Sequence, residues 1–203
     1  MMRSVLIAGM IVLVGLIAPA NAATRDVVAT QLSAANASIA QYNRTHATGS
    51  LDSALQSLAN AGSQRLEGSD RASVTSVYLT LFAALDRAMP HLPPGKLPKI
   101  SVQPPPVNGV SYPAGIDPSA IPDPKARARY QEAIRENEAL SAQFLNAFSL
   151  RQVDTRATLL FSKFAHDAFN STHTDQNALR HQIEASGLSA ETKHRLLTAA
   201  TST

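Results

Sequence analysis

Apolar residues recur every three or four positions along most of this chain, which is the spacing of one face of an α-helix. In residues 24–44 the recurrence forms a single stripe: Val28, Leu32, Ala35, Ile39 and Tyr42. No stretch alternates apolar and polar residues for long enough to predict a strand. Alanine, the residue that costs least in a helix, is abundant. The sequence therefore predicts an all-α protein, a helical bundle of about five to seven helices.

Residues 23–89 are predicted to form an N-terminal segment of three helices. The second helix covers 51–61, with Ser50 as its N-cap. The third begins at Asp70 as N-cap and ends before Pro90, because proline cannot continue the helical hydrogen-bond ladder. Its spacing predicts a core face made of Val74, Val77, Tyr78, Leu81, Leu85 and Ala88.

Residues 90–123 are rich in proline: eleven of the twelve prolines lie between Pro90 and Pro124. Such a segment cannot be helical and should be extended, largely as polyproline II. It is either a solvated spacer or an ordered strap docked on the helices. Its apolar residues favour the docked strap, since a spacer would carry polar residues there: Ile100, Val102, Val107, Val110, Tyr112, Ile116 and Ile121.

The C-terminal helical segment, 124–203, starts with a helix capped by Asp123 with Pro124 in its first turn. No proline or glycine interrupts the chain from there to Phe169. The apolar stripe, however, changes to nearly the opposite face near Ser149. Either the chain turns there, or one long helix over about 124–169 contributes to two cores. The absence of a helix breaker favours the long helix.

That long helix would be followed by two short ones. Asp175 is the predicted N-cap of a helix over 176–186. Ser189 is the predicted N-cap of a last helix over about 190–200.

Residues 1–22 have the pattern of a signal peptide. Arg3 provides a short positive region, and an uncharged apolar run follows from Val5 to Ala18. Ala20-Asn21-Ala22 then gives the small-x-small pattern that precedes cleavage. The run is shorter than the roughly 20 residues of a membrane-spanning helix. We therefore expect export, without a stable membrane span after cleavage. A bacterial periplasm or extracellular space is the favoured destination, because small exported eukaryotic domains usually carry disulfides and this chain has no cysteine.

Composition and motifs exclude several chemistries. With no cysteine, the chain has no disulfide, no thiol nucleophile and no zinc–thiolate site. A formal charge of +3 is too small to predict nucleic-acid binding. No glycine-rich phosphate loop and no Gly-x-Ser-x-Gly elbow is present, and the histidines lack metal-ligand spacing. The sequence predicts no cofactor, no metal site and no catalytic residues.

Two groups of charged residues follow Pro124. Glu132, Glu136 and their arginine neighbours have the spacing of a solvated, salt-bridged helix face. Lys125, Arg127 and Arg129 are more unusual, because cations in a first helical turn oppose the helix dipole. They are candidates for binding an anion or an acidic partner, although a solvent-screened surface cluster with Asp123 nearby is the simpler interpretation.

These signals favour a non-enzymatic exported protein that acts by binding or scaffolding, with an unidentified protein or envelope component as its partner. The alternative is a hydrolase whose site is assembled from residues distant in sequence. An enzyme would require a concave pocket with several buried ionisable groups. A binding protein would instead show a groove or an exposed apolar patch.

If residues 1–22 are a signal peptide, the exported protein begins at Ala23. An Ala22→Phe substitution should block processing, because the residue before the cleavage point must be small. The control, Asn21→Phe, changes the middle position of the pattern and should be processed normally. Intact mass of the protein made in a bacterium measures both, and a wild-type chain that keeps residues 1–22 would contradict the hypothesis.

Overall fold

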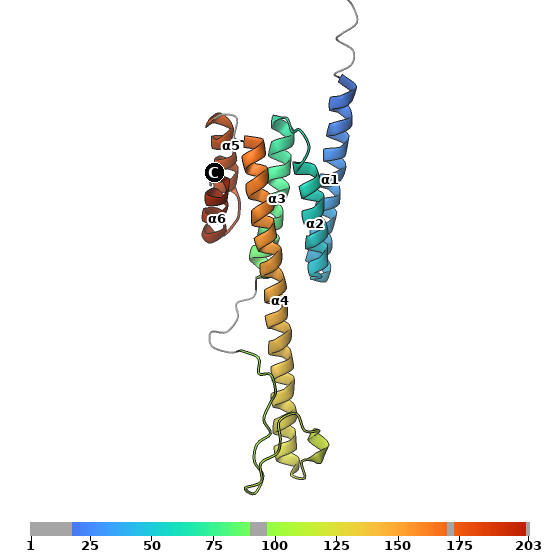
Figure 1. Cartoon of the computed structure of the whole chain (residues 1–203), viewed down its shortest axis with the longest axis vertical. Helices are drawn as coiled ribbons and strands as arrows, with labels where there is room; N and C mark the ends of the chain where they lie inside the picture. Colours follow the sequence, from blue (N-terminus) through green and yellow to red (C-terminus); the bar gives the residue numbers. More distant parts are fainter. Residues whose placement is uncertain (1–17, 90–96, 170–172, 202–203) are drawn as a thin grey trace, which may run out of the picture. The chain divides into compact units, whose positions relative to one another are not determined.

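The computed structural model describes residues 18–89, 97–169 and 173–201, and this part of the chain contains six α-helices and no strand (Figure 1). The elements are α1 (Ala18–Thr45), α2 (Thr48–Gly62), α3 (Gly68–Ala88), a 3-10 turn at Pro118–Ala120, α4 (Pro124–Phe169), α5 (His173–Ala185) and α6 (Ala190–Thr201). The predicted all-α helical bundle is confirmed.

The chain divides into two compact units, and one boundary between them falls inside α4. Unit 1 combines residues 1–84 with 156–203, so that it holds α1, α2 and most of α3 together with the end of α4, α5 and α6. Unit 2 is residues 85–155 and contains the proline-rich segment and the longer part of α4. Segments far apart in the sequence therefore share one unit.

The centre of unit 1 is a cluster of aromatic rings from α3 and the end of α4. Tyr78 meets Phe161 edge-on and stacks on Phe164, with centroid distances of 5.5 Å in both pairs. Phe82 adds a T-shaped contact to Phe161 at 6.0 Å, and Phe169 adds one to Phe164 at 5.8 Å. All five rings are buried. Edge-on and offset ring pairs add to the stabilisation that burial of the rings provides.

Helices α1 and α2 pack side by side (Figure 1). The predicted apolar stripe of α1 is buried at Val28, Ala35, Ile39 and Tyr42 and half-buried at Leu32. The predicted start of α2 after Ser50 is wrong, because the helix begins at Thr48. The turn between the helices is at His46, whose φ of 55° reverses the chain. Gly49 lies inside the helix with open space around it. A residue with positive φ, rather than the glycine, therefore sets this boundary.

Two other predicted N-caps are also wrong. Asp70 and Asp175 lie within the first turns of α3 and α5, which begin two residues earlier than those aspartates. There their negative charges interact favourably with the partial positive charge of the helix N-termini. Asp123 and Ser189 do act as predicted: the Asp123 carboxylate accepts from the Lys125 N–H at 3.0 Å, and the Ser189 hydroxyl accepts from the Thr192 N–H at 3.2 Å.

Helix α4 is a single helix of 46 residues, so the predicted long helix is confirmed. The buried positions also change face near Ser149, as the apolar pattern indicates. The expectation that all the apolar residues of its first half face a core is wrong for three of them. Phe144, Leu145 and Phe148 are 37%, 65% and 56% exposed.

Within unit 2, residues 97–123 lie against the first turns of α4. Tyr130 and Ile121 are fully buried, and apolar side chains pack around them: Ala126, Val102, Val107, Ile116 and Ile134. The Tyr130 hydroxyl accepts from the Gly115 N–H at 3.2 Å. The Asn137 carboxamide pairs with the backbone N–H and C=O of Lys99 at 2.7 and 3.0 Å. These are contacts of a docked strap; its residues 90–96 lie outside the described part of the chain.

A two-residue turn shapes this segment. Val107 and Val110 exchange backbone hydrogen bonds of 3.0 and 2.9 Å around Asn108 and Gly109. Both turn residues have positive φ, 49° and 82°. Asn-Gly is the pair that adopts this conformation most readily, because asparagine tolerates it and glycine has no Cβ to strain.

The burial pattern of α4 predicts that two phenylalanine-to-alanine substitutions on this helix change the free energy of unfolding by very different amounts. Phe161→Ala should lower the free energy of unfolding by about 3–5 kcal/mol, because it removes a ring at the centre of the buried cluster. Phe148→Ala should change it by less than about 1 kcal/mol, since that ring is already more than half exposed. Urea unfolding followed by circular dichroism measures both. Equal effects would contradict this core assignment.

Candidate functional site

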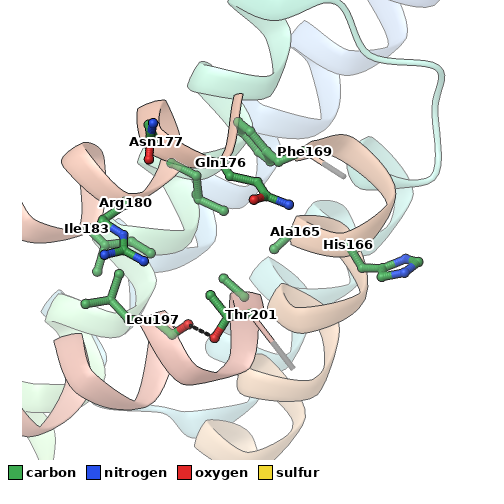
Figure 2. A pocket seen from close by; sticks show the side chains of 11 residues that line it. Ala165, His166, Phe169, Gln176, Asn177, Arg180, Ile183, Leu197 and Thr201 are labelled. Atoms are coloured by element: carbon green, nitrogen blue, oxygen red, sulfur yellow. Dashed lines mark hydrogen bonds between the residues drawn. The ribbon is translucent and has the colours of Figure 1, made fainter. Parts of the chain in front are cut away.

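The candidate site is a pocket of about 240 Å³ in unit 1, between the end of α4 and the helices α5 and α6 (Figure 2). Its floor is apolar: Ala165, Phe169, Leu179, Ile183, Leu197 and Ala200. Its rim is polar: His166, Gln176, Asn177, Arg180 and Thr201. An apolar hollow with a few polar groups around it is the usual form of a small-molecule site.

Arg71 holds one wall of this pocket in place. From α3, its guanidinium donates to the Ala168 carbonyl at 2.5 Å and lies 3.4 Å from the Asp175 carboxylate. The same group lies over the Phe169 ring, 5.5 Å from its centroid. Both ionic side chains are less than a third exposed. One side chain thus fixes the last turn of α4 and the first turn of α5 to α3.

Two contacts hold the α6 wall. The Ser162 hydroxyl of α4 donates to the Ala199 carbonyl of α6 at 2.7 Å. The Lys193 ammonium of α6 donates to the Glu184 carbonyl, near the end of α5, at 2.8 Å. Together with the Ser189 cap, these bonds set the position of α6 in the wall of the pocket. Polar contacts that lie outside the apolar floor therefore join α6 to α4 and to α5.

The polar groups of the rim are not equivalent. The Thr201 hydroxyl donates to the Leu197 carbonyl at 3.0 Å, and the His166 imidazole lies 3.3 Å from the Asp167 carboxylate and points away from the hollow (Figure 2). Arg180 and Gln176 reach over the hollow from α5 (Figure 2). Within the described part of the chain, neither of these two side chains has a hydrogen-bond or ion-pair partner.

The lining has little of what catalysis needs. Among the described residues that form it there is no carboxylate, and the one hydroxyl, that of Thr201, already donates to a backbone carbonyl. Neither ionisable lining residue, His166 or Arg180, contacts this hydroxyl as a general base would contact a nucleophile. The arrangement suits binding of an apolar group with a polar end.

A second hollow of about 290 Å³ lies in the same unit between α2, α3 and α4. Tyr78, Lys163 and Asp167 provide its ionisable groups. Burial raises the pKa of the Tyr78 phenol, so this group stays protonated and cannot act as a base at neutral pH. The hydroxyl of Ser63 in its wall donates to the Asn60 carbonyl at 2.9 Å. This hollow does not place a nucleophile beside a base.

Unit 2 carries an exposed apolar face formed by Phe144, Leu145 and Phe148 on α4. Phe148 lies four positions after Phe144 and three after Leu145, so it is a neighbour of both on one side of the helix. Singly exposed apolar residues are ordinary on protein surfaces. Three large ones on neighbouring positions form a small apolar patch, which sequence periodicity alone assigns to a core.

The structure separates the three predicted anion-binding residues. The Arg127 side chain is half-buried, and its Nε and Nη2 both donate to the Ile121 carbonyl, at 3.0 and 2.8 Å. Arg127 therefore serves to anchor the proline-rich segment. Lys125 and Arg129 are exposed on nearly the opposite face of the helix, and anion binding by these two remains a prediction.

The other charged residues of this region behave as a solvated face. Arg135 and Glu132 form an exposed ion pair at 2.7 Å, as their spacing predicts. No group of three or more histidine or acidic side chains within the described ranges could hold a metal ion. None of the helices in these ranges is both long and apolar enough to cross a membrane.

Comparisons with protein-family models, with curated proteins and with solved structures find no match to this chain.

The role of Arg71 predicts that its loss loosens the pocket. Arg71→Met should lower the free energy of unfolding by about 1–3 kcal/mol, because it removes charged hydrogen bonds from a partly buried site. Amide exchange in α5 should accelerate more than in α2. The control, Arg156→Met, breaks the exposed pair with Asp52, 2.6 Å long, and should cost less than about 1 kcal/mol. Equal exchange rates in α5 of both variants would contradict this role.

Proposed function

We propose that this chain is an exported, non-enzymatic binding protein of the bacterial periplasm or extracellular space, and that its pocket between α4, α5 and α6 receives an apolar group. The observation that carries the proposal is the composition of that pocket. Its described lining combines six apolar side chains with Arg180 and Gln176, which are exposed and make no hydrogen bond or ion pair within the described part of the chain. Such groups are available to a ligand.

The proposal of export rests on the N-terminal sequence. Arg3, the apolar run from Val5 to Ala18 and the Ala20-Asn21-Ala22 pattern are the three parts of a signal peptide. Helix α1 starts at Ala18, so cleavage before Ala23 removes five of its residues and leaves the buried positions from Val28 onward in the mature chain. The core of unit 1 therefore does not depend on the leader.

The partner is a protein or another envelope component that presents an apolar group. A pocket of about 240 Å³ is below the usual range of about 300–1,000 Å³ for drug-sized ligands, so its occupant is small. The floor supplies burial energy, at about 25 cal/mol per Å² of apolar surface. A single side chain or a short apolar chain would be enough to fill it.

A bulky residue inside the pocket tests this function. Ala200→Phe fills the space between α5 and α6, and we expect it to abolish recovery of the partner when the exported protein is purified from the envelope after crosslinking. The matched control is Ala178→Phe, which adds the same ring at an exposed position of α5. Equal circular dichroism spectra and melting temperatures would show that both variants fold.

The outcomes separate the two hypotheses of function. One component recovered with the wild type and with Ala178→Phe, but not with Ala200→Phe, supports the proposal. Recovery that does not change in Ala200→Phe, or no recovery at all, overturns it. Turnover of a generic ester or glycoside by the purified wild type, lost in Ala200→Phe, would instead establish the hydrolase alternative.

A further inference from the structure

Arg180 is the described side chain that gives the pocket between α4, α5 and α6 its chemical character. Its guanidinium lies beside the hollow without an internal hydrogen-bond or ion-pair partner, and the Gln176 carboxamide lies one helical turn before it on α5 (Figure 2). His166, the other basic residue of the lining, points away. The pocket lining thus combines the Arg180 guanidinium and the amides of Gln176 and Asn177 with an apolar floor.

On the basis of the proposed function, we propose that this pocket binds a small carboxylate amphiphile. The carboxylate accepts hydrogen bonds from the Arg180 guanidinium and from the Gln176 amide, and the apolar chain lies on the floor formed by Phe169, Ile183 and Leu197. This assigns a binding role to Arg180 and Gln176, whose sequence context contains no motif.

The charge of the rim selects the head group. One guanidinium balances the single negative charge of a carboxylate, and its planar fork can donate two parallel hydrogen bonds to the two carboxylate oxygens. A cationic head group would be repelled by Arg180, and no carboxylate among the described lining residues would attract it. A neutral head group would gain the floor contacts alone.

The size of the pocket limits the length of the ligand's apolar chain. The volume of about 240 Å³ is smaller than that of most ligand sites, which limits the occupant to about ten non-hydrogen atoms. Octanoate has about that many non-hydrogen atoms, in an unbranched apolar chain with a carboxylate at one end. The part of the ligand that enters the pocket is therefore an aliphatic acid about as long as a short fatty acid.

Three probes with the same chain measure the head-group preference: octanoate, octan-1-ol and octylammonium. Titration of the mature protein, followed by calorimetry and by backbone amide NMR shifts, should show octanoate binding about three- to tenfold more tightly than octan-1-ol, with octylammonium weakest. Raising the salt concentration should reduce the preference for octanoate and leave octan-1-ol binding unchanged, because salt screens the exposed charge.

Two arginine substitutions distinguish an effect of Arg180 at the site from an effect of the protein's net charge. Arg180→Met should make the affinities for octanoate and octan-1-ol equal, while it keeps the apolar stem of the side chain. Arg65→Met removes the same charge from an exposed position between α2 and α3 and should keep the preference of the wild type. Shifts of the Ile183 and Ala200 amides should report occupancy in all three proteins.

Each result has a distinct meaning. Octanoate preference that disappears in Arg180→Met supports the inference. Equal binding of octanoate and octan-1-ol by the wild type, with shifts at Ile183 and Ala200, overturns the carboxylate and leaves the apolar pocket of the proposed function in place. No binding of any probe, or shifts confined to other residues, overturns the inference; the proposed function is then judged separately by the recovery experiment with Ala200→Phe.

Discussion

The contact of Phe161 and Phe164 with Tyr78 is the interaction on which the rest of unit 1 depends. It joins the end of α4 to α3, two segments separated by more than eighty positions in the sequence. Once these rings are packed, the last turn of α4 is placed where Phe169 extends the cluster and Arg71 can reach the Ala168 carbonyl. The pocket then forms where α5 and α6 close over that turn.

The sequence was sufficient to predict the helices, but less so their ends. Helix α4 follows from the absence of breakers and from the Asp123 cap, both of which are local. The errors occur where a local signal competes with tertiary contacts. Asp175 looks like an N-cap, yet its carboxylate faces Arg71. Ser50 also looks like an N-cap, yet it lies inside α2, because His46 makes the turn before the helix. The Asn108-Gly109 turn has a clear sequence signature that helical periodicity does not reveal.

The candidate site was not predictable, for a physical reason. Arg180 and Gln176 lie on a short polar helix where any such residue is expected to be solvated, and the floor of the pocket comes from three helices. What distinguishes Arg180 is its place in the lining of a pocket with an apolar floor, which only the folded structure can show. Arg127 is the opposite case: its place in a first helical turn suggests an anion site, while its side chain holds the Ile121 carbonyl.

The construction of the pocket from the sides of helices also favours the proposed binding function over catalysis. Backbone N–H groups inside a helix already donate to carbonyls four residues earlier, so the walls offer no fixed backbone donors to a developing charge. Polar recognition depends instead on long side chains such as Arg180, which lose rotamer freedom when they bind. A site of this kind gives moderate affinity and a preference for charge, whereas acyl transfer requires preorganised donors and a nucleophile held beside its base. The wall contacts of Arg71 and Ser162 position the apolar floor, and that floor is where most of the binding energy must arise.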